Sequence, residues 1–292
     1  TVLSQGCLPE GITFTSQIEI DNFQANYPNC REILGTVVVA GESITNFNGL
    51  NILTSINQNF ELNNLHDLIE LNSLNNLTAI NGDFKLTYNT KLKHLDGLNN
   101  LSFIGGNLEI SDNDSLHSLT GLNSLDSTNG NFSIGHNYSL ESISGFEELN
   151  FIGSNVRLKW CQFNDFNELN NLEKIGGNLE IAFNDFLKSL TGLEKISSIG
   201  GELKISYNWN LNSIESLINL KSISGSLIIE GNKSLESLRG LDSISPTTIN
   251  DLIVRNNDYL SICEVLSICN FIELPNAQLT INDNSTGCDS DS

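Results

Sequence analysis

A repeat of 24 residues covers most of this chain and limits what it can fold into. Residues 105–128 read GGNLEISDNDSLHSLTGLNSLDST, and residues 176–199 read GGNLEIAFNDFLKSLTGLEKISSI. Such a period predicts one supersecondary unit per copy, each stacked on the next to bury a shared core. Further copies begin at Asn57, Asn81, Asn129, Gly153, Gly200 and Ser224, and the copy at Gly153 is shortened to 23 residues.

Each copy follows the same pattern of apolar and polar residues. Two apolar residues in alternation, such as Leu108 and Ile110, predict a short strand. An Asn follows three residues later, and Leu or Ile then recurs at every third position. The repeated Asn should lie inside the coil and form a ladder, because its amide can satisfy backbone groups where the strand bends. The ladder positions are Asn89, Asn113, Asn137, Asn184, Asn208, Asn232, Asn257 and Asn284.

This pattern predicts a mainly β fold, a right-handed parallel β-helix or leucine-rich-repeat-like solenoid of about 10 coils with short helical caps at both ends. Caps are expected because open coils expose apolar side chains and unpaired strands. We expect an N-terminal cap in residues 1–34, the solenoid in residues 35–260 and a C-terminal cap in residues 261–292.

Both predicted caps contain a helix start signal. A capping box at Ser16–Glu19 predicts a short helix to about Asn26. A second capping box at Ser261–Glu264 predicts a helix that ends before Pro275. The apolar face of this second helix is expected to consist of Ile262, Val265, Leu266, Cys269 and Ile272.

Five of the six cysteines lie near the ends of the repeat array. Cys7 can pair with Cys30 to fasten the first cap, and Cys288 can pair with either Cys263 or Cys269 in the second. Disulfides at both ends favour an oxidising compartment. Zinc is disfavoured because there is no Cys-x-x-Cys motif and no His near a Cys.

The composition limits the partners of the protein. The formal net charge is −21, which disfavours nucleic acid and anionic membranes because phosphate binding needs clustered Lys and Arg. No stretch approaches the roughly 18 apolar residues of a membrane span. The chain opens at Thr1 without a signal peptide, and we interpret it as a mature or trimmed form. We therefore expect a monomer that is secreted or displayed at the cell surface and does not insert into membranes.

The position just before each ladder position should face solvent on the sheet side. It is aromatic at Tyr88, Trp160, Phe183 and Tyr207, and a second Trp, Trp209, lies just past the ladder. Aromatic rings beside cations are typical of binding hot spots. Two interpretations remain open, a ligand-binding patch and rings that pack on each other at the corner of the coil. The candidate ligand-binding residues are Tyr88, Arg157, Lys159, Trp160, Phe183, Lys204, Tyr207 and Trp209.

Signatures of catalysis and of cofactor binding are missing from the sequence. There is no Gly-x-Ser-x-Gly, His-Glu-x-x-His or phosphate-binding Gly loop, and the four His residues occupy different repeat positions. Calcium at residues 112–114 or 282–284 is disfavoured because Asn113 and Asn284 belong to the ladder. Cys161 occupies the ladder position of the shortened coil and is expected to be a buried, inert thiol. We predict no catalytic residue, metal or cofactor.

Three segments together resemble the receptor L-domain family of leucine-rich-repeat-like β-helices, closest to its secreted members from Bacteroidetes-type bacteria. They are CLPEGITFTSQIEIDNFQANYPNC at residues 7–30, the coils GGNLEI…N…L…SLTGL, and the ending SICEVLSICNFIELPNA. The resemblance implies extracellular recognition or adhesion, with a protein or carbohydrate ligand and no shared catalytic residues. The alternative is a polysaccharide-degrading parallel β-helix enzyme, which is disfavoured because no inserted loop walls a cleft.

Overall fold

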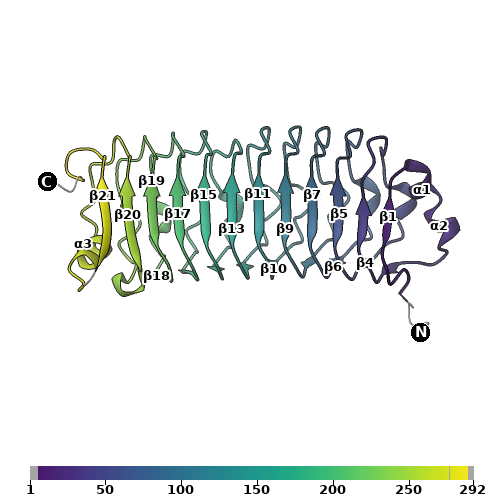
Figure 1. Cartoon of the computed structure of the whole chain (residues 1–292), viewed down its shortest axis with the longest axis horizontal. Helices are drawn as coiled ribbons and strands as arrows, with labels where there is room; N and C mark the ends of the chain where they lie inside the picture. Colours follow the sequence, from purple (N-terminus) through teal and green to yellow (C-terminus); the bar gives the residue numbers. More distant parts are fainter. Residues whose placement is uncertain (1–5, 276, 289–292) are drawn as a thin grey trace. The chain divides into compact units, whose positions relative to one another are not determined.

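The computed structural model describes residues 6–275 and 277–288. Its internal contacts divide the chain into two compact units, Thr1–Leu149 and Asn150–Ser292, which we call the N-terminal unit and the C-terminal unit. Both units are built from the same element, a coil with one longer strand and, in most coils, one strand of two residues. All strand pairing within each unit is parallel, as the repeat predicts (Figure 1).

In the N-terminal unit, successive longer strands pair side by side, and successive short strands form a second sheet. The register keeps equivalent repeat positions together, so that Leu108 is opposite both Phe84 and Phe132. The longer strands are β1 (Ile12–Phe14), β3 (Val37–Val39), β5 (Phe60–Asn63), β7 (Phe84–Thr87), β9 (Leu108–Ser111) and β11 (Phe132–Gly135). The short strands are β2 (Glu32–Ile33), β4 (Ser55–Ile56), β6 (Ala79–Ile80), β8 (Phe103–Ile104) and β10 (Ser127–Thr128), and 3₁₀ turns occupy η1 (Asn48–Leu50) and η2 (Asn72–Leu74).

The C-terminal unit repeats this arrangement. Leu179 on β15 is paired with Val156 on one side and Leu203 on the other, so the apolar column continues from coil to coil. The longer strands are β13 (Val156–Lys159), β15 (Leu179–Ala182), β17 (Leu203–Ser206), β19 (Leu227–Glu230), β20 (Asp251–Arg255) and β21 (Gln278–Asn282). The short strands are β12 (Phe151–Ile152), β14 (Lys174–Ile175), β16 (Ser198–Ile199) and β18 (Ser222–Ile223), with 3₁₀ turns η3 (Asn167–Leu169), η4 (Glu215–Leu217) and η5 (Pro246–Thr248).

The Asn ladder runs through the interior of both units, as predicted. Seven of its members are fully buried, namely Asn89, Asn113, Asn137, Asn184, Asn208, Asn232 and Asn257. At Asn208, the side-chain amide donates to the carbonyl of Ile181 at 3.0 Å. The Asn208 Oδ1 accepts the backbone N–H of Asn184 at 3.1 Å. Each Asn therefore satisfies backbone groups of earlier coils that would otherwise be buried without a partner. The backbone N–H of Cys161 joins the ladder by donating to Asn184 at 3.1 Å, and Cys161 is buried as expected.

A second polar ladder, which the sequence analysis did not identify, lies where the chain enters each longer strand. The Asn59 side chain accepts the backbone N–H of Asp83, and Asp83 accepts that of Asn107, at 2.9 and 2.8 Å. In the C-terminal unit, Asn178 accepts the N–H of Glu202 at 2.8 Å. Asn and Asp replace one another along this column because each supplies the one acceptor that the next coil needs.

The N-terminal cap contains two short helices, α1 (Gln17–Asp21) and α2 (Phe23–Asn26), instead of one continuous helix. The Glu19 carboxylate accepts the backbone N–H groups of Thr15 and Ser16, which is the glutamate half of the predicted capping box. The hydrogen bonds from Thr15 lower the pKa of Glu19. A disulfide between Cys7 and Cys30 fastens this cap.

The C-terminal cap corrects two predictions. Its helix, α3 (Leu266–Ile272), begins four residues later than the Ser261 capping box implied. The reason is that Ile262 still belongs to a coil, where its carbonyl accepts the N–H of Leu238 at 2.9 Å. The buried face is also different, because Ile268 and Phe271 point inward while Leu266, Cys269 and Ile272 are exposed. Cys288 pairs with Cys263, which resolves the pairing that the sequence left open.

Candidate ligand-binding surface

The candidate aromatic residues just before the ladder positions have an unusual backbone conformation at the end of each longer strand. The residue before each ladder position has a positive φ, which is 53° at Trp160, 59° at Phe183 and 56° at Tyr207. This left-handed conformation costs a side chain with a Cβ roughly 1–2 kcal/mol. It turns the chain sharply into the ladder position. The aromatic residues therefore occupy a column of strained turns, a feature that spacing alone did not reveal.

Three of the predicted aromatic residues form one continuous stack. The ring centroids of Trp160 and Phe183 are 4.3 Å apart with the planes 3° from parallel. Those of Phe183 and Tyr207 are 5.0 Å apart with the planes 7° from parallel. Both faces of the Phe183 ring are covered by its neighbours, so its edge is what it can offer to a ligand. The structure thus supports the packing interpretation for the ring faces and leaves the edges available.

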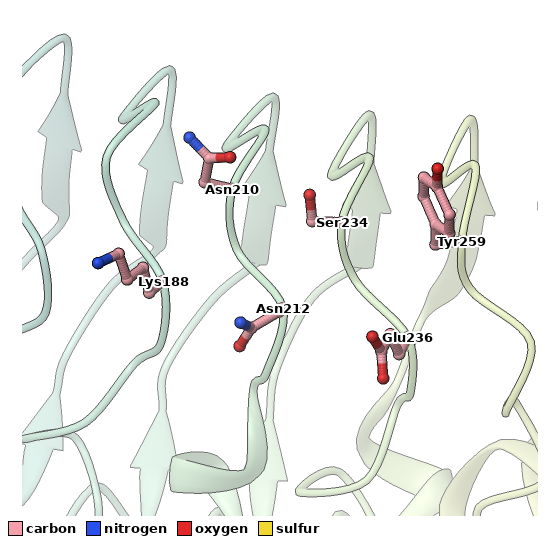
Figure 2. Close-up of a pocket in the computed structure, with 6 residues that line it drawn as sticks. All are labelled: Lys188, Asn210, Asn212, Ser234, Glu236 and Tyr259. Carbon is pink, nitrogen blue, oxygen red and sulfur yellow. The ribbon is translucent and has the colours of Figure 1, made fainter.

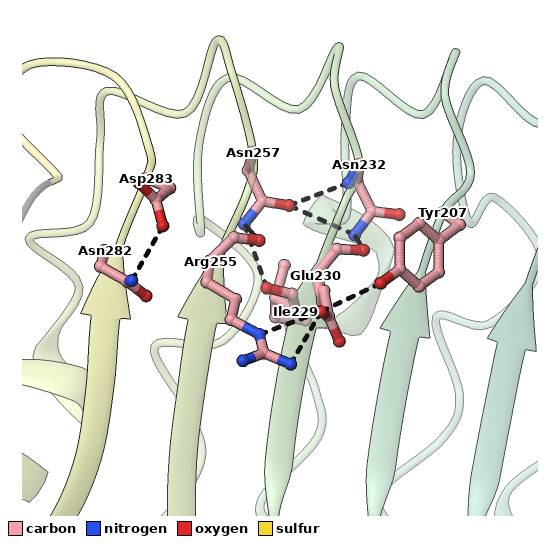
Figure 3. Close-up of polar contacts among 8 residues, drawn as sticks. All are labelled: Tyr207, Ile229, Glu230, Asn232, Arg255, Asn257, Asn282 and Asp283. Atoms are coloured by element: carbon pink, nitrogen blue, oxygen red, sulfur yellow. Dashed lines mark hydrogen bonds and ion pairs between the residues drawn. The ribbon is translucent and has the colours of Figure 1, made fainter.

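The stack ends at a network that holds Tyr207 (Figure 3). Its hydroxyl donates to Oε1 of Glu230 at 3.0 Å, and Arg255 holds the same oxygen through Nε and Nη2, each at 2.9 Å. The hydrogen bond to Glu230, reinforced by partial burial, raises the pKa of Tyr207 above its ordinary value. The next turn residue is Gly231, where a Cβ would lie 2.5 Å from Cδ1 of Tyr207. Glycine there leaves room for the ring.

The predicted cations converge on one carboxylate next to the stack. Glu180 of β15 lies 2.7 Å from Nζ of Lys159, 3.7 Å from Nζ of Lys204 and 3.8 Å from Nε of Arg157. The Glu180 side chain is 20% exposed, whereas that of Arg157 is 50% exposed. Three cations around one carboxylate leave a local excess of positive charge in a chain of net charge −21. We call Arg157, Lys159, Lys204, Trp160, Phe183 and Tyr207 the cation–aromatic patch.

Two of the predicted residues lie apart from this patch. Trp209 lies beyond the ladder on the following turn, is 52% exposed, and has Nζ of Lys233 at 5.4 Å from its ring centroid. Tyr88 belongs to the N-terminal unit, where its ring is 52% exposed between turn residues that are not aromatic. The sequence prediction therefore grouped residues from three separate environments.

Sequence reasoning missed the Glu230–Arg255 pair. A signal was present, because these residues occupy the same repeat position on adjacent strands and carry opposite charges. It also missed that the equivalent positions Ala182 and Ser206 are fully buried although they point outward. Their small size leaves room for rings that fold back over the ends of the strands.

The described residues offer no cluster of metal ligands and no membrane-spanning helix, and comparison with known proteins assigns no family. Among the described residues, no three or more His, Cys, Asp or Glu side chains gather in a way that could hold a metal ion. None of the helices in the same part of the chain combines the length and hydrophobicity needed to cross a bilayer. No family model and no curated protein matches the chain, so the resemblance to receptor L-domains stays a prediction.

Proposed function

We propose that this protein is a non-enzymatic extracellular recognition or adhesion module of the receptor L-domain type. Its ligand is a protein or glycan that carries an acidic group and contacts the cation–aromatic patch. Disulfides in both caps support an oxidising, extracellular setting. The regular parallel sheets support a binding role, because solenoids present extended surfaces on which side chains from successive coils act together.

The observation that carries this proposal is the convergence of three cations beside exposed ring edges. Arg157, Lys159 and Lys204 would each attract an acidic group. The arginine can also form a bidentate hydrogen bond with a carboxylate or sulfate. The edge of an aromatic ring carries partial positive charge, so Phe183 adds to the same potential. Because the rest of the chain is strongly acidic, a ligand with one or a few acidic groups fits better than a long polyanion.

The non-enzymatic part of the proposal rests on the carboxylates of this surface. Glu180 and Glu230 both form ion pairs with cations of this surface. Such pairing favours a structural role for these carboxylates over the role of the catalytic acid and base of a glycosidase. Release of reducing ends from any polysaccharide incubated with the purified protein would overturn this part.

A binding screen tests the proposal. The probes are oligosaccharides from alginate, pectin and heparin, neutral dextran, and sialylated glycoproteins before and after removal of their acidic sugars. We expect binding to one or more acidic probes, lost in the double variant Arg157→Ala/Lys204→Ala. The matched control is Lys174→Ala/Lys221→Ala, which removes the same charge from exposed positions elsewhere in the C-terminal unit. Equal losses in both double variants, or no binding to any acidic probe, would refute the patch.

A further inference from the structure

A polar groove lies on the turns of the C-terminal unit and shares no residue with the cation–aromatic patch (Figure 2). It has a volume of about 380 Å³. Its walls come from turn residues two and four positions past the ladder asparagines, so successive coils contribute one residue to each of two rows. The lining residues are Lys188, Asn210, Asn212, Ser234, Glu236 and Tyr259.

Most of the polar groups in this groove have unused hydrogen-bonding capacity. In the described part of the chain, the side chains of Lys188, Asn212, Ser234 and Glu236 make no hydrogen bond or ion pair. By contrast, Lys91, two residues past Asn89 in the N-terminal unit, is paired with Asp67 at 2.7 Å. The groove therefore gathers an amine, an amide, a hydroxyl and a carboxylate that are all free to bind a ligand.

The chemistry of these groups indicates the class of ligand. The groove offers both donors and acceptors, and the positive charge of Lys188 is balanced by the negative charge of Glu236. Tyr259 stands at one end with its ring 68% exposed, which offers an apolar surface beside the polar groups. Amide, hydroxyl and carboxylate groups hydrogen-bond the neighbouring hydroxyls of a sugar, while an aromatic ring covers its C–H face. An anionic ligand would meet Glu236 without an excess of cations.

We propose that the polar groove binds an uncharged oligosaccharide, at a site separate from the cation–aromatic patch. The site has room for more than one sugar ring, because a second hollow of about 380 Å³ continues from it and shares Asn212 and Glu236. That hollow adds the hydroxyls of Ser213 and Ser237 and the guanidinium of Arg239.

Titration of the intact protein with neutral hexasaccharides of glucose, mannose, xylose and galactose, followed by calorimetry, tests this proposal. We expect at least one of them to bind, and Tyr259→Ala to weaken its binding by about tenfold or more. Asn212→Ala should weaken it further when combined with Tyr259→Ala. The matched control is Tyr138→Ala, which removes a tyrosine that is 50% exposed on a turn of the N-terminal unit and should leave binding unchanged.

Three results would overturn the site. They are no binding of any neutral hexasaccharide, equal losses in Tyr259→Ala and Tyr138→Ala, and binding of an unstructured peptide at this groove in preference to the sugars. The Arg157→Ala/Lys204→Ala variant separates the two proposals, because it should retain neutral sugar binding in full. Absence of sugar binding at the groove would not affect the proposal for the cation–aromatic patch, and absence of binding at the patch would not affect the proposal for the groove.

Discussion

Replacing Phe183 by Ala and by Gly separates two contributions to stability: the stacking of its ring and the strain of its backbone. Phe183 makes two stacked contacts, at 4.3 and 5.0 Å, and each is worth about 0.5–1.5 kcal/mol beyond burial. Phe183→Ala and Phe183→Gly therefore both lose roughly 1–3 kcal/mol of stacking. Alanine keeps the strain of a φ of 59°, whereas glycine removes it. We expect Phe183→Ala to be less stable than Phe183→Gly by about 1 kcal/mol.

Guanidinium denaturation followed by circular dichroism measures this difference. The control is the same pair of substitutions at Phe186, a ring in the same coil that is 54% exposed and does not have a positive φ. There the ordinary order should hold, with the glycine variant less stable by roughly 0.5–1 kcal/mol. If Phe183→Gly is also less stable than Phe183→Ala, the argument from backbone strain is wrong.

Three further predictions concern the ladder, the titration of the stack and the caps. Asn208→Ala should destabilise the protein by about 2–6 kcal/mol in chemical denaturation, because it leaves two buried backbone groups without partners at about 1–3 kcal/mol each. The raised pKa of Tyr207 should make it ionise later than an exposed tyrosine in an ultraviolet titration. The stability that it contributes is therefore complete below the unfolded pKa of about 10 and is lost as the pH rises through the folded pKa, a loss absent in Tyr207→Phe. Replacing Cys7 and Cys30 together by Ser should cost about 3 kcal/mol in the same denaturation assay, since the bridge spans a sequence separation of 23 residues.

The fold could be predicted from the sequence because its determinants repeat. Leu108, Ile110 and Asn113 recur in register in almost every coil, so a local pattern specifies the same strand and the same buried amide many times. The C-terminal cap was predicted less accurately than the coils. Ser261–Glu264 has the letters of a helix start, but Ile262 is held in a coil by its hydrogen bond with Leu238. A tertiary contact there outweighs a local signal.

The candidate surface was predicted only in part, for a different reason. Spacing placed Trp160, Phe183 and Tyr207 in one column, and the structure stacks them. Whether rings in a column meet face to face depends on backbone angles, and the positive φ of these turns is not encoded in any single residue type. The polar groove was missed because it depends on which side chains remain without partners. The residue type at a repeat position does not reveal this property.

The residues just before the ladder positions include one aromatic side chain, Tyr88, whose backbone strain no stacked ring in the described part of the chain offsets. Aromatic residues at a positive φ are strained, and a neighbouring ring can offset that strain by stacking. Tyr88 has the same strain, with a φ of 59°, but its neighbours in the column are Asp112 and Asn64. Its ring is 52% exposed and forms no ring contact among the described residues. Tyr88→Gly should therefore stabilise the protein by about 1 kcal/mol, because, unlike Phe183→Gly, it relieves the strain without loss of ring stacking. A stabilised variant in thermal denaturation would mean that folding does not explain this tyrosine, and that a ligand contact in the N-terminal unit should be sought around it. A destabilised variant would mean that the ring supports its own coil.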